Sequence, residues 1–204
     1  MPIPGLAENQ IGVGPFPAVA ARNAAELAGL VGRAETEQRS ATAANGPAPI
    51  LILAIGNRLL QDDGVGMELL SKLAPFHEEW GTAVELIDGG TCGLALLGAV
   101  LDRAAVVFLD AVKLGAEPGS VHVLRKGELL GMSGHGSTAH EGGAKDILAA
   151  LALLGGTPRE VAVVGMEPAS VATGIGLSEA VEARLGEAVN RVREVVGQFI
   201  QAGR

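Results

Sequence analysis

Two neighbouring carboxylates, Asp62 and Asp63, follow an apolar run that is typical of a buried β-strand. The run covers Ile50–Ile55, and the carboxylates are followed by Gly64 and Gly66 at the start of a helix-like pattern. In an open α/β sheet, ligands bind beyond the carboxyl ends of the strands. Two acidic side chains at such a point suit a cation better than a phosphate, whose charge they would repel. The pattern therefore predicts a cation site, and Asp63 is its most informative residue.

Two further strand candidates also end in carboxylates. Asp88 begins an Asp-Gly-Gly-Thr turn, and Asp110 directly follows the run Ala105–Leu109. If these strands are parallel, the carboxylates lie along one edge of the sheet, where clustered buried negative charge is costly without a counter-charge. We therefore expect a cation or a basic partner nearby. Asp88 is interpreted as the cap of its glycine turn and a support for the site, and direct action in catalysis is the alternative.

A histidine could add a nitrogen ligand to these oxygens. His140 lies in a polar, glycine-bearing loop at the start of a helix pattern that covers Ala139–Leu154. Thr138 and Glu141 have the spacing of a capping box, which makes Thr138 the N-cap and places His140 in the first turn. A helix N-terminus disfavours the charged imidazolium, so we expect the neutral ring, the form that ligates metals. A solvent-exposed histidine without ligands explains the same residues equally well.

Asp63, Asp110 and His140 together would supply two oxygens and one nitrogen. This mixed set suits a borderline divalent ion such as nickel, zinc or iron better than calcium or magnesium. The three side chains belong to three separate loops, so they resemble a site that fills only part of a metal's coordination shell. The sequence contains no His-Glu-x-x-His helix and no convincing serine or cysteine triad, which argues against a zinc protease and a triad hydrolase.

Four other residues receive structural interpretations. Asp62 is expected to cap the following helix, with metal ligation as the alternative. Cys92 is expected to be a small buried residue rather than a nucleophile. His77 and His122 are expected to be structural or exposed.

Alternating strand-like and helix-like patterns place these residues in an α/β fold. We expect a single three-layer domain with a mostly parallel, twisted sheet of about five strands and helices on both faces. Residues 111–119 are too few for a helical crossover, so the fourth strand is expected to be antiparallel. Ser178 is expected to cap the last helix. The expected strands are Ile50–Ile55, Ala83–Ile87, Ala105–Leu109, Ser120–Leu124 and Glu160–Val164, and the expected helices are Val65–Leu73, Leu94–Leu101, Ala139–Leu154 and Ser178–Ala202.

Composition limits the function classes further. Hydrophobic residues make up 48% of the 204 residues and aromatic residues only 2%, as expected for a core of aliphatic side chains. The formal net charge of −8 argues against nucleic-acid binding, which depends on Lys and Arg. No apolar run is long enough to cross a bilayer, and a single cysteine favours a reducing cytoplasm. Residues 1–48 are rich in Ala, Gly and Pro and are expected to form a flexible or partly helical extension before the α/β domain of residues 49–204.

Several of these motifs together resemble a known family, the endopeptidases that mature nickel–iron hydrogenases. The segment Gly56–Gly66 is similar to the family's opening motif, and the later motifs follow in the same order. They are Asp88–Thr91, Asp110–Val112, His140–Gly143 with Asp146, Gly165–Pro168 and Leu177–Val181. The resemblance covers residues 50 to about 200, which is essentially the whole α/β part.

The resemblance implies a helix-covered twisted sheet and a specific activity. The family's enzymes cut a short C-terminal extension from the hydrogenase large-subunit precursor after nickel has been inserted. Its metal-contacting residues correspond to Asp63, Asp110 and His140, and some relatives have glutamate where this chain has Asp63. The nickel would be supplied by the substrate, and the protein itself would hold no tightly bound metal.

We therefore predict a cytoplasmic hydrolase, a protease with aspartyl-type carboxylates that acts on the hydrogenase large-subunit precursor. Asp63 and Asp88 would be the catalytic residues, and Asp63, Asp110 and His140 would contact the nickel. No nucleic acid and no membrane is expected as a partner. One alternative is a nickel-binding chaperone or sensor that cuts nothing, and another is an α/β small-molecule hydrolase.

Overall fold

Five strands form one sheet in the computed structural model, which describes residues 48–131 and 143–203. Their order across the sheet is β2-β1-β3-β5-β4, with β4 antiparallel to β5 and the other neighbours parallel. This confirms the expected three-layer α/β fold with a mostly parallel sheet. The strands are β1 (Ile50–Ala54), β2 (Val84–Asp88), β3 (Ala105–Ala111), β4 (Val121–Arg125) and β5 (Glu160–Met166).

The burial of each strand follows from its place in the sheet. Every residue of β1 and β3 is buried, because both faces of these inner strands are covered by helices. Apart from Asp110 near the end of β3, their sequences are accordingly apolar, as is usual for parallel sheets. The edge strand β4 is only half-buried along its length, which explains why it can carry His122 and Arg125.

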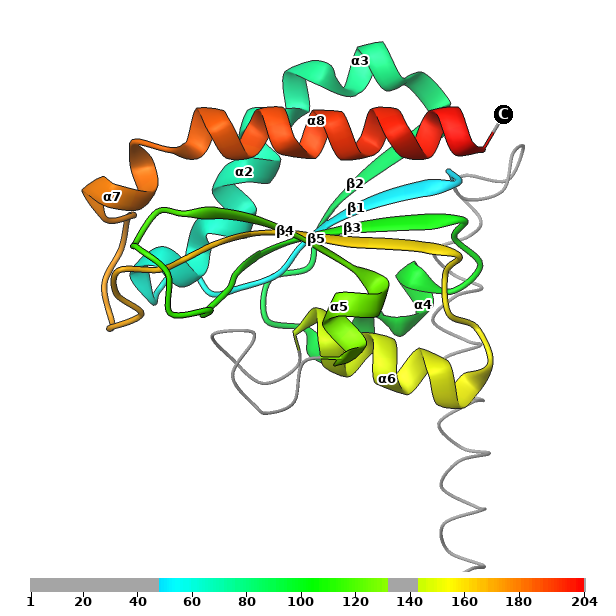
Figure 1. The fold of residues 1–204 in the computed structure, drawn as a ribbon, viewed down its shortest axis with the longest axis horizontal. Helices are drawn as coiled ribbons and strands as arrows, with labels where there is room; N and C mark the ends of the chain where they lie inside the picture. Colours follow the sequence, from blue (N-terminus) through cyan, green and yellow to red (C-terminus); the bar gives the residue numbers. More distant parts are fainter. Residues whose placement is uncertain (1–47, 132–142, 204) are drawn as a thin grey trace, which may run out of the picture. The chain divides into compact units, whose positions relative to one another are not determined.

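Two layers of helices enclose the sheet, as Figure 1 shows. One layer contains α2, α3, α7 and α8, and apolar side chains of α2 and α8 share a core with β1, β3 and β5. The other contains α4, α5 and α6, and its side chains pack on the opposite faces of the same strands. The helices are α2 (Val65–Leu73), α3 (His77–Trp80), α4 (Leu97–Val100), α5 (Lys126–Gly131), α6 (Ala144–Leu154), α7 (Glu179–Glu182) and α8 (Leu185–Ala202).

The helix boundaries differ from the predictions mainly at glycines and turns. Gly143 has an extended backbone (ψ −175°) and is the N-cap of α6, so the predicted helix over Ala139–Leu154 is wrong at its start. Thr138 therefore does not cap α6, and the first turn of α6 begins after position 140, so it gives no reason to expect a neutral His140. Thr138 and His140 themselves lie outside the described residues.

The last predicted helix is confirmed at its N-cap but is divided in two. The backbone N–H of Val181 donates to Oγ of Ser178 at 3.4 Å, so Ser178 caps α7. A break then separates α7 from α8 at Arg184, whose backbone is not helical (φ −109°, ψ 6°). The short helix α5 was not predicted, because two glycines in six residues hide its apolar pattern.

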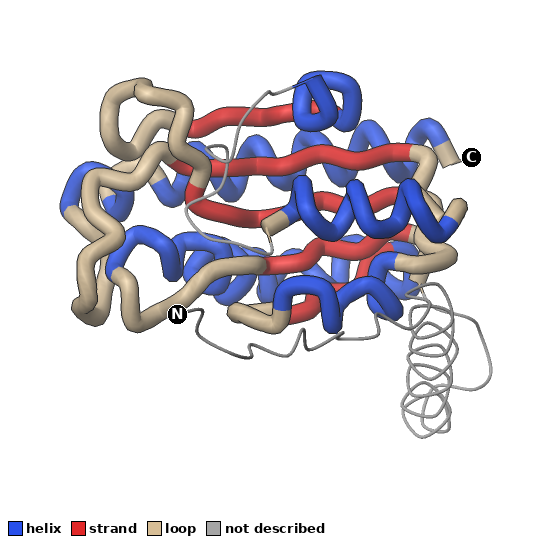
Figure 2. The backbone as a smooth tube through the Cα atoms, turned by 90° about the horizontal axis from the view of Figure 1, so that it is seen from below, coloured by secondary structure: helices blue, strands red, loops and turns tan. Residues whose placement is uncertain are grey.

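Figure 2 shows the strands running side by side between the two helical layers. The parallel strands β1, β2, β3 and β5 all finish at the same end of the sheet, where the β3–β4 and β5–α7 connections also lie. Among the described residues, no helix has the length and apolarity needed to cross a bilayer. The predicted extension, residues 1–48, falls almost entirely outside the described residues and stays a prediction.

Candidate active site

The strand-end carboxylates share the carboxyl edge of the sheet. In the parallel register, Ala54 at the end of β1 lies opposite Asp88 on one side and Leu109 on the other. Asp110 is the next residue of β3. The strand pairing that the sequence argument required is therefore present, and it brings Asp88 and Asp110 to the end of β1.

Asp63 reaches the same edge through a tight turn after β1. It lies in the 3₁₀ helix η1 (Gln61–Gly64), which packs against β3. The backbone N–H of Asn57 donates to its Oδ2 at 2.8 Å, and the residue is only 1% exposed. The turn requires glycine at position 56, where φ is +135° and a Cβ would lie 1.9 Å from the carbonyl oxygen of Asp63. The local backbone thus fixes where the Asp63 carboxylate lies.

Asp110 is fully buried near the carboxyl end of β3. The backbone N–H of Ile55 donates to the carbonyl of Leu109 at 2.9 Å, which continues the β1–β3 pairing to this point. A Cβ on Gly66 would lie 2.4 Å from the Leu109 carbonyl oxygen and 2.6 Å from that of Ile55. Glycine at position 66 therefore lets the first turn of α2 sit directly on the strand ends.

Buried carboxylates at one strand edge have a clear chemical use. A charged side chain removed from water needs compensating partners, and a cation bound at the edge would supply one. Oxygen ligands of this kind can bind a divalent metal ion or, near a peptide, accept a proton from water. Asp63 and Asp110 are our candidates for this role.

Asp88 is more exposed and caps the turn beside it, as interpreted from the sequence. The backbone N–H of Gly90 donates to its Oδ1 at 3.1 Å, and a guanidinium nitrogen of Arg58 lies 3.3 Å from its Oδ2. Arg58 also lies 3.7 Å from a carboxylate oxygen of Glu68. All three side chains are about half exposed, so these ion pairs contribute little stability. The two ion pairs hold the positively charged guanidinium of Arg58 beside the carboxylates at the strand ends.

Asp62 does not cap helix α2, so that prediction is wrong. Its side chain is fully buried and accepts four hydrogen bonds from the connection between β5 and α7. The donors are the backbone N–H groups of Ala169 (2.8 Å), Ser170 (3.1 Å) and Ser178 (2.6 Å), and the hydroxyl of Ser178 (2.8 Å). Asp62 thereby ties the β5–α7 loop to the segment that carries Asp63.

His140, the predicted nitrogen ligand, lies outside the described residues. Within the residues that the structure does describe, no three His, Cys, Asp or Glu side chains form a group that could hold a metal ion. Asp63 and Asp110 would therefore need further ligands, from His140 or from a substrate, to fill a coordination shell.

Glu167 is a buried carboxylate that the sequence reasoning did not single out. Its oxygens accept from the backbone N–H groups of Leu114 (2.8 Å) and Gly115 (3.2 Å), which fixes the loop after β3. His122 on β4 lies nearby, with its Nε2 3.9 Å from Oε2 of Glu167. Its position directly after β5 could have identified it from the sequence, because it is another carboxylate at the end of a strand.

Two more interpretations are tested by burial. Cys92 is exposed, so the expected small buried residue is wrong. It follows a glycine turn at the carboxyl end of β2 and precedes the 3₁₀ helix η4 (Gly93–Leu96). His77 is exposed at the start of α3, as expected.

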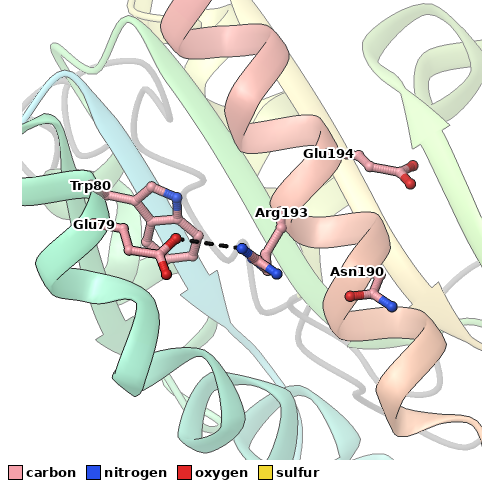
Figure 3. A pocket seen from close by; sticks show the side chains of 5 residues that line it. All are labelled: Glu79, Trp80, Asn190, Arg193 and Glu194. Carbon is pink, nitrogen blue, oxygen red and sulfur yellow. Dashed lines mark hydrogen bonds and ion pairs between the residues drawn. The ribbon is translucent and has the colours of Figure 1, made fainter.

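Two depressions on the described surface lie away from Asp63 and Asp110. Figure 3 shows one between α3 and α8, lined by Glu79, Trp80, Asn190, Arg193 and Glu194. Arg193 lies 3.4 Å from Glu79 and 4.1 Å from the centre of the Phe76 ring. A second depression lies between α5 and α8. Neither includes Asp63 or Asp110.

Comparison with known proteins supplies independent information. Residues 67–195 match a family model described as hydrogenase maturation protease, a span that includes Asp88 and Asp110 and begins after Asp63. The hydrogenase 2 maturation protease of Escherichia coli K12 is 34% identical over 145 residues, which is 70% of this chain and 87% of that protein. A hydrogenase expression/formation protein, HupM, of Azotobacter chroococcum is 38% identical over 145 residues, 69% of this chain and 68% of its own.

Solved structures agree with these matches. The hydrogenase maturating endopeptidase HybD from E. coli superposes with a TM-score of 0.65 at 32% identity, covering 73% of this chain and 92% of that one. The nickel–iron hydrogenase maturation protease HybD from Thermococcus kodakarensis has a TM-score of 0.58 at 27% identity, covering 72% of this chain and 98% of that one.

Proposed function

Because the chain belongs to the hydrogenase maturation protease family, we propose that it is the endopeptidase that removes the C-terminal extension from a nickel-loaded hydrogenase large-subunit precursor. The observation that carries this proposal is the pair of buried carboxylates, Asp63 and Asp110, at one strand edge. They suit a metal that arrives with the substrate, since they can provide only part of its ligands.

Asp63, Asp110 and His140 would contact the nickel that the precursor holds. The contact would identify a loaded precursor and place its scissile peptide at the carboxyl edge of the sheet. Asp63 is suited to this role because the Asn57 N–H and the turn at Gly56 hold it in place before substrate arrives. A preorganised ligand loses little entropy when the substrate binds.

Hydrolysis needs a water molecule that is activated beside the scissile carbonyl. The water adds to the carbonyl carbon, its proton passes to a base, and the leaving amine takes up a proton as the C–N bond breaks. Asp63 is our candidate for the base, and Asp88 for orienting the water or the peptide. Asp88 has the freedom to do so because its side chain is half exposed.

The proposal also includes the location and the partners of the protein. We propose a cytoplasmic enzyme, since a chain with a single cysteine suits a reducing compartment. Its macromolecular partner would be the large-subunit precursor, and the acidic net charge disfavours nucleic acid.

The deciding experiment mixes the full-length chain with nickel-loaded and nickel-free precursor and measures the intact masses of the products. We expect loss of a C-terminal peptide from the loaded precursor alone. Asp63→Asn should reduce the rate by about a thousandfold or more, because the amide is a poorer base and ligand. The matched control is Asp102→Asn, the same change at an exposed turn residue with φ +63° that asparagine tolerates well, and it should leave the rate unchanged.

Two results would count against the proposal. Processing by Asp63→Asn at the normal rate would remove Asp63 from the reaction. Absence of cleavage, together with tight nickel binding by the chain alone, would indicate a nickel chaperone or sensor instead.

A further inference from the structure

Exposed apolar side chains concentrate around the candidate active site. Among the described residues, six large apolar side chains are exposed, and four of them follow the carboxyl ends of parallel strands: Leu59 after β1, Leu94 after β2, Leu114 after β3 and Ile175 after β5. The other two, Leu153 and Leu154, end helix α6 at the opposite edge. Single exposed apolar residues need no explanation, but a concentration of them around one site is typical of a contact surface.

Leu59 and Ile175 belong to loops that are joined by backbone hydrogen bonds. Leu60 and Gly174 form a parallel β-bridge. The N–H of Gly174 donates to the Leu59 carbonyl at 2.9 Å, and the N–H of Gln61 donates to the Gly174 carbonyl at 3.0 Å. These bonds hold together the segments that carry the two apolar side chains, which are 61% and 88% exposed.

Asp62 also holds these two loops together, through its buried side chain. Its buried carboxylate receives the N–H groups of Ala169, Ser170 and Ser178 and the hydroxyl of Ser178. The β5–α7 loop is thus fixed at both of its ends to one residue. Asp63, the candidate base, is the next residue of the chain. The hydrogen bonds of Asp62 therefore also hold the loop that carries Ile175 in a defined position relative to Asp63.

We propose that Leu59 and Ile175, positioned by Asp62, bind an apolar segment of the polypeptide substrate next to the scissile bond. This inference rests on the proposed function, which places the cleavage beside Asp63. A polypeptide is the occupant that fits, since an endopeptidase must hold the chain on at least one side of the bond that it cuts.

The first test replaces exposed side chains whose loss does not disturb the core. Ile175→Ser and Leu59→Ser in the full-length chain should each raise KM for nickel-loaded precursor about fivefold or more, and kcat should stay within about twofold because these residues do not touch the reacting atoms. Leu153→Ser is the matched control, since Leu153 is 90% exposed at the opposite edge. It should change neither constant.

The second test examines Asp62 as a positioning residue. Asp62→Asn places an amide against N–H donors, so amide hydrogen exchange should speed up at Ala169, Ser170 and Ser178 but not in β3. KM should rise as in Ile175→Ser at a temperature where the variant is fully folded, whereas a purely structural role would leave KM unchanged under those conditions. Ser178→Ala gives the same test if Asp62→Asn does not fold, and Ser178→Thr, which keeps the hydroxyl, should restore wild-type behaviour.

The outcomes separate this inference from the proposed function. Wild-type KM in the Leu59→Ser, Ile175→Ser double variant would overturn the binding surface, and unchanged KM despite faster exchange in Asp62→Asn would overturn the role of Asp62. Both results could occur while Asp63→Asn remains inactive, which would leave the proposed function standing. Dimerisation of the free chain that Ile175→Ser abolishes, together with unchanged KM, would assign the surface to a second copy of the chain and overturn the inference.

Discussion

Adjacent aspartates at positions 62 and 63 have different physical roles. Both carboxylate oxygens of Asp62 accept hydrogen bonds from the β5–α7 loop, three at Oδ2 and one at Oδ1. This buried carboxylate therefore holds the loop in place. Asp63 instead accepts the N–H of Asn57 within its own loop and lies against β3, next to the strand end that carries Asp110.

Asp88 permits a test of direct action against indirect support. Asp88→Asn should keep the contact with the Gly90 N–H, lose the attraction to Arg58, and change the free energy of unfolding by less than about 1 kcal/mol. If Asp88 orients the water or the peptide, kcat should fall about tenfold or more. Steady-state kinetics on nickel-loaded precursor and chemical denaturation give the two quantities.

Glu68→Gln is the control for Asp88→Asn, because Glu68 also pairs with Arg58 at 3.7 Å. It should leave kcat unchanged. An equal loss in both variants would mean that the position of Arg58, and not Asp88 itself, matters for the reaction.

At the scale of elements, the sequence predicted the strands well and the loops poorly. Apolar residues dominate the strands, so the position of each strand was predictable to within two residues at either end. Helix ends depended on single glycines such as Gly143, whose conformation is not readable from the pattern. The bonds from Asp62 to Ala169 and Ser178 join residues more than 100 positions apart. No local spacing contains that information, so a residue expected to cap a helix proved to anchor a distant loop.

The contact between α2 and the strand ends gives an element-scale prediction. Gly66→Ala should lower the free energy of unfolding by about 3 kcal/mol, because its Cβ would meet the backbone carbonyls of Leu109 and Ile55, which cannot move aside easily. Urea denaturation measures the change. Because α2 follows the Asp63 turn directly, processing by the folded fraction should also fall.

Gly197→Ala is the matched change in another helix. Gly197 lies inside α8, and a Cβ there would have no neighbour within 4 Å. The free energy of unfolding should rise by about 0.5–1 kcal/mol, the usual gain for alanine in a helix interior. Equal effects of both substitutions would show that close packing at Gly66 is not the cause.

At the scale of the whole α/β unit, the two ends of the sheet have separate tasks. The carboxyl edge carries the candidate active site. At the other end, the buried side chain of Arg103 lies 2.6 Å from Glu85 and donates to the carbonyls of Ala99 (2.9 Å) and Ala48 (2.7 Å). Arg103 thereby joins the segment that enters β1 to β2 and to the end of α4.

Arg103→Met should therefore affect stability and spare the reaction. The lost charge-assisted bonds leave two carbonyls unsatisfied, so the free energy of unfolding should fall by about 2 kcal/mol. The control, Arg191→Met, removes an exposed ion pair with Glu194 and should change the free energy of unfolding by less than about 0.5 kcal/mol. Well below the unfolding transition, both variants should process precursor at the wild-type rate, and a reduced kcat in Arg103→Met would show that the two ends are coupled.

The arrangement of ligands also predicts how nickel and precursor affect each other's binding. If Asp63, Asp110 and the precursor share one nickel ion, a loaded precursor must bind the chain more tightly than a nickel-free one, and the chain must increase nickel affinity by the same factor. A coupling of about 10-fold or more is expected for such shared ligation. It can be measured by titrating both precursors into the Asp88→Asn chain, in which we expect slower cleavage. Adding Asp110→Asn to that chain should abolish the difference. Equal affinities of the two precursors for the chain would mean that the buried carboxylates do not recognise the metal, and that they serve the cleavage step alone.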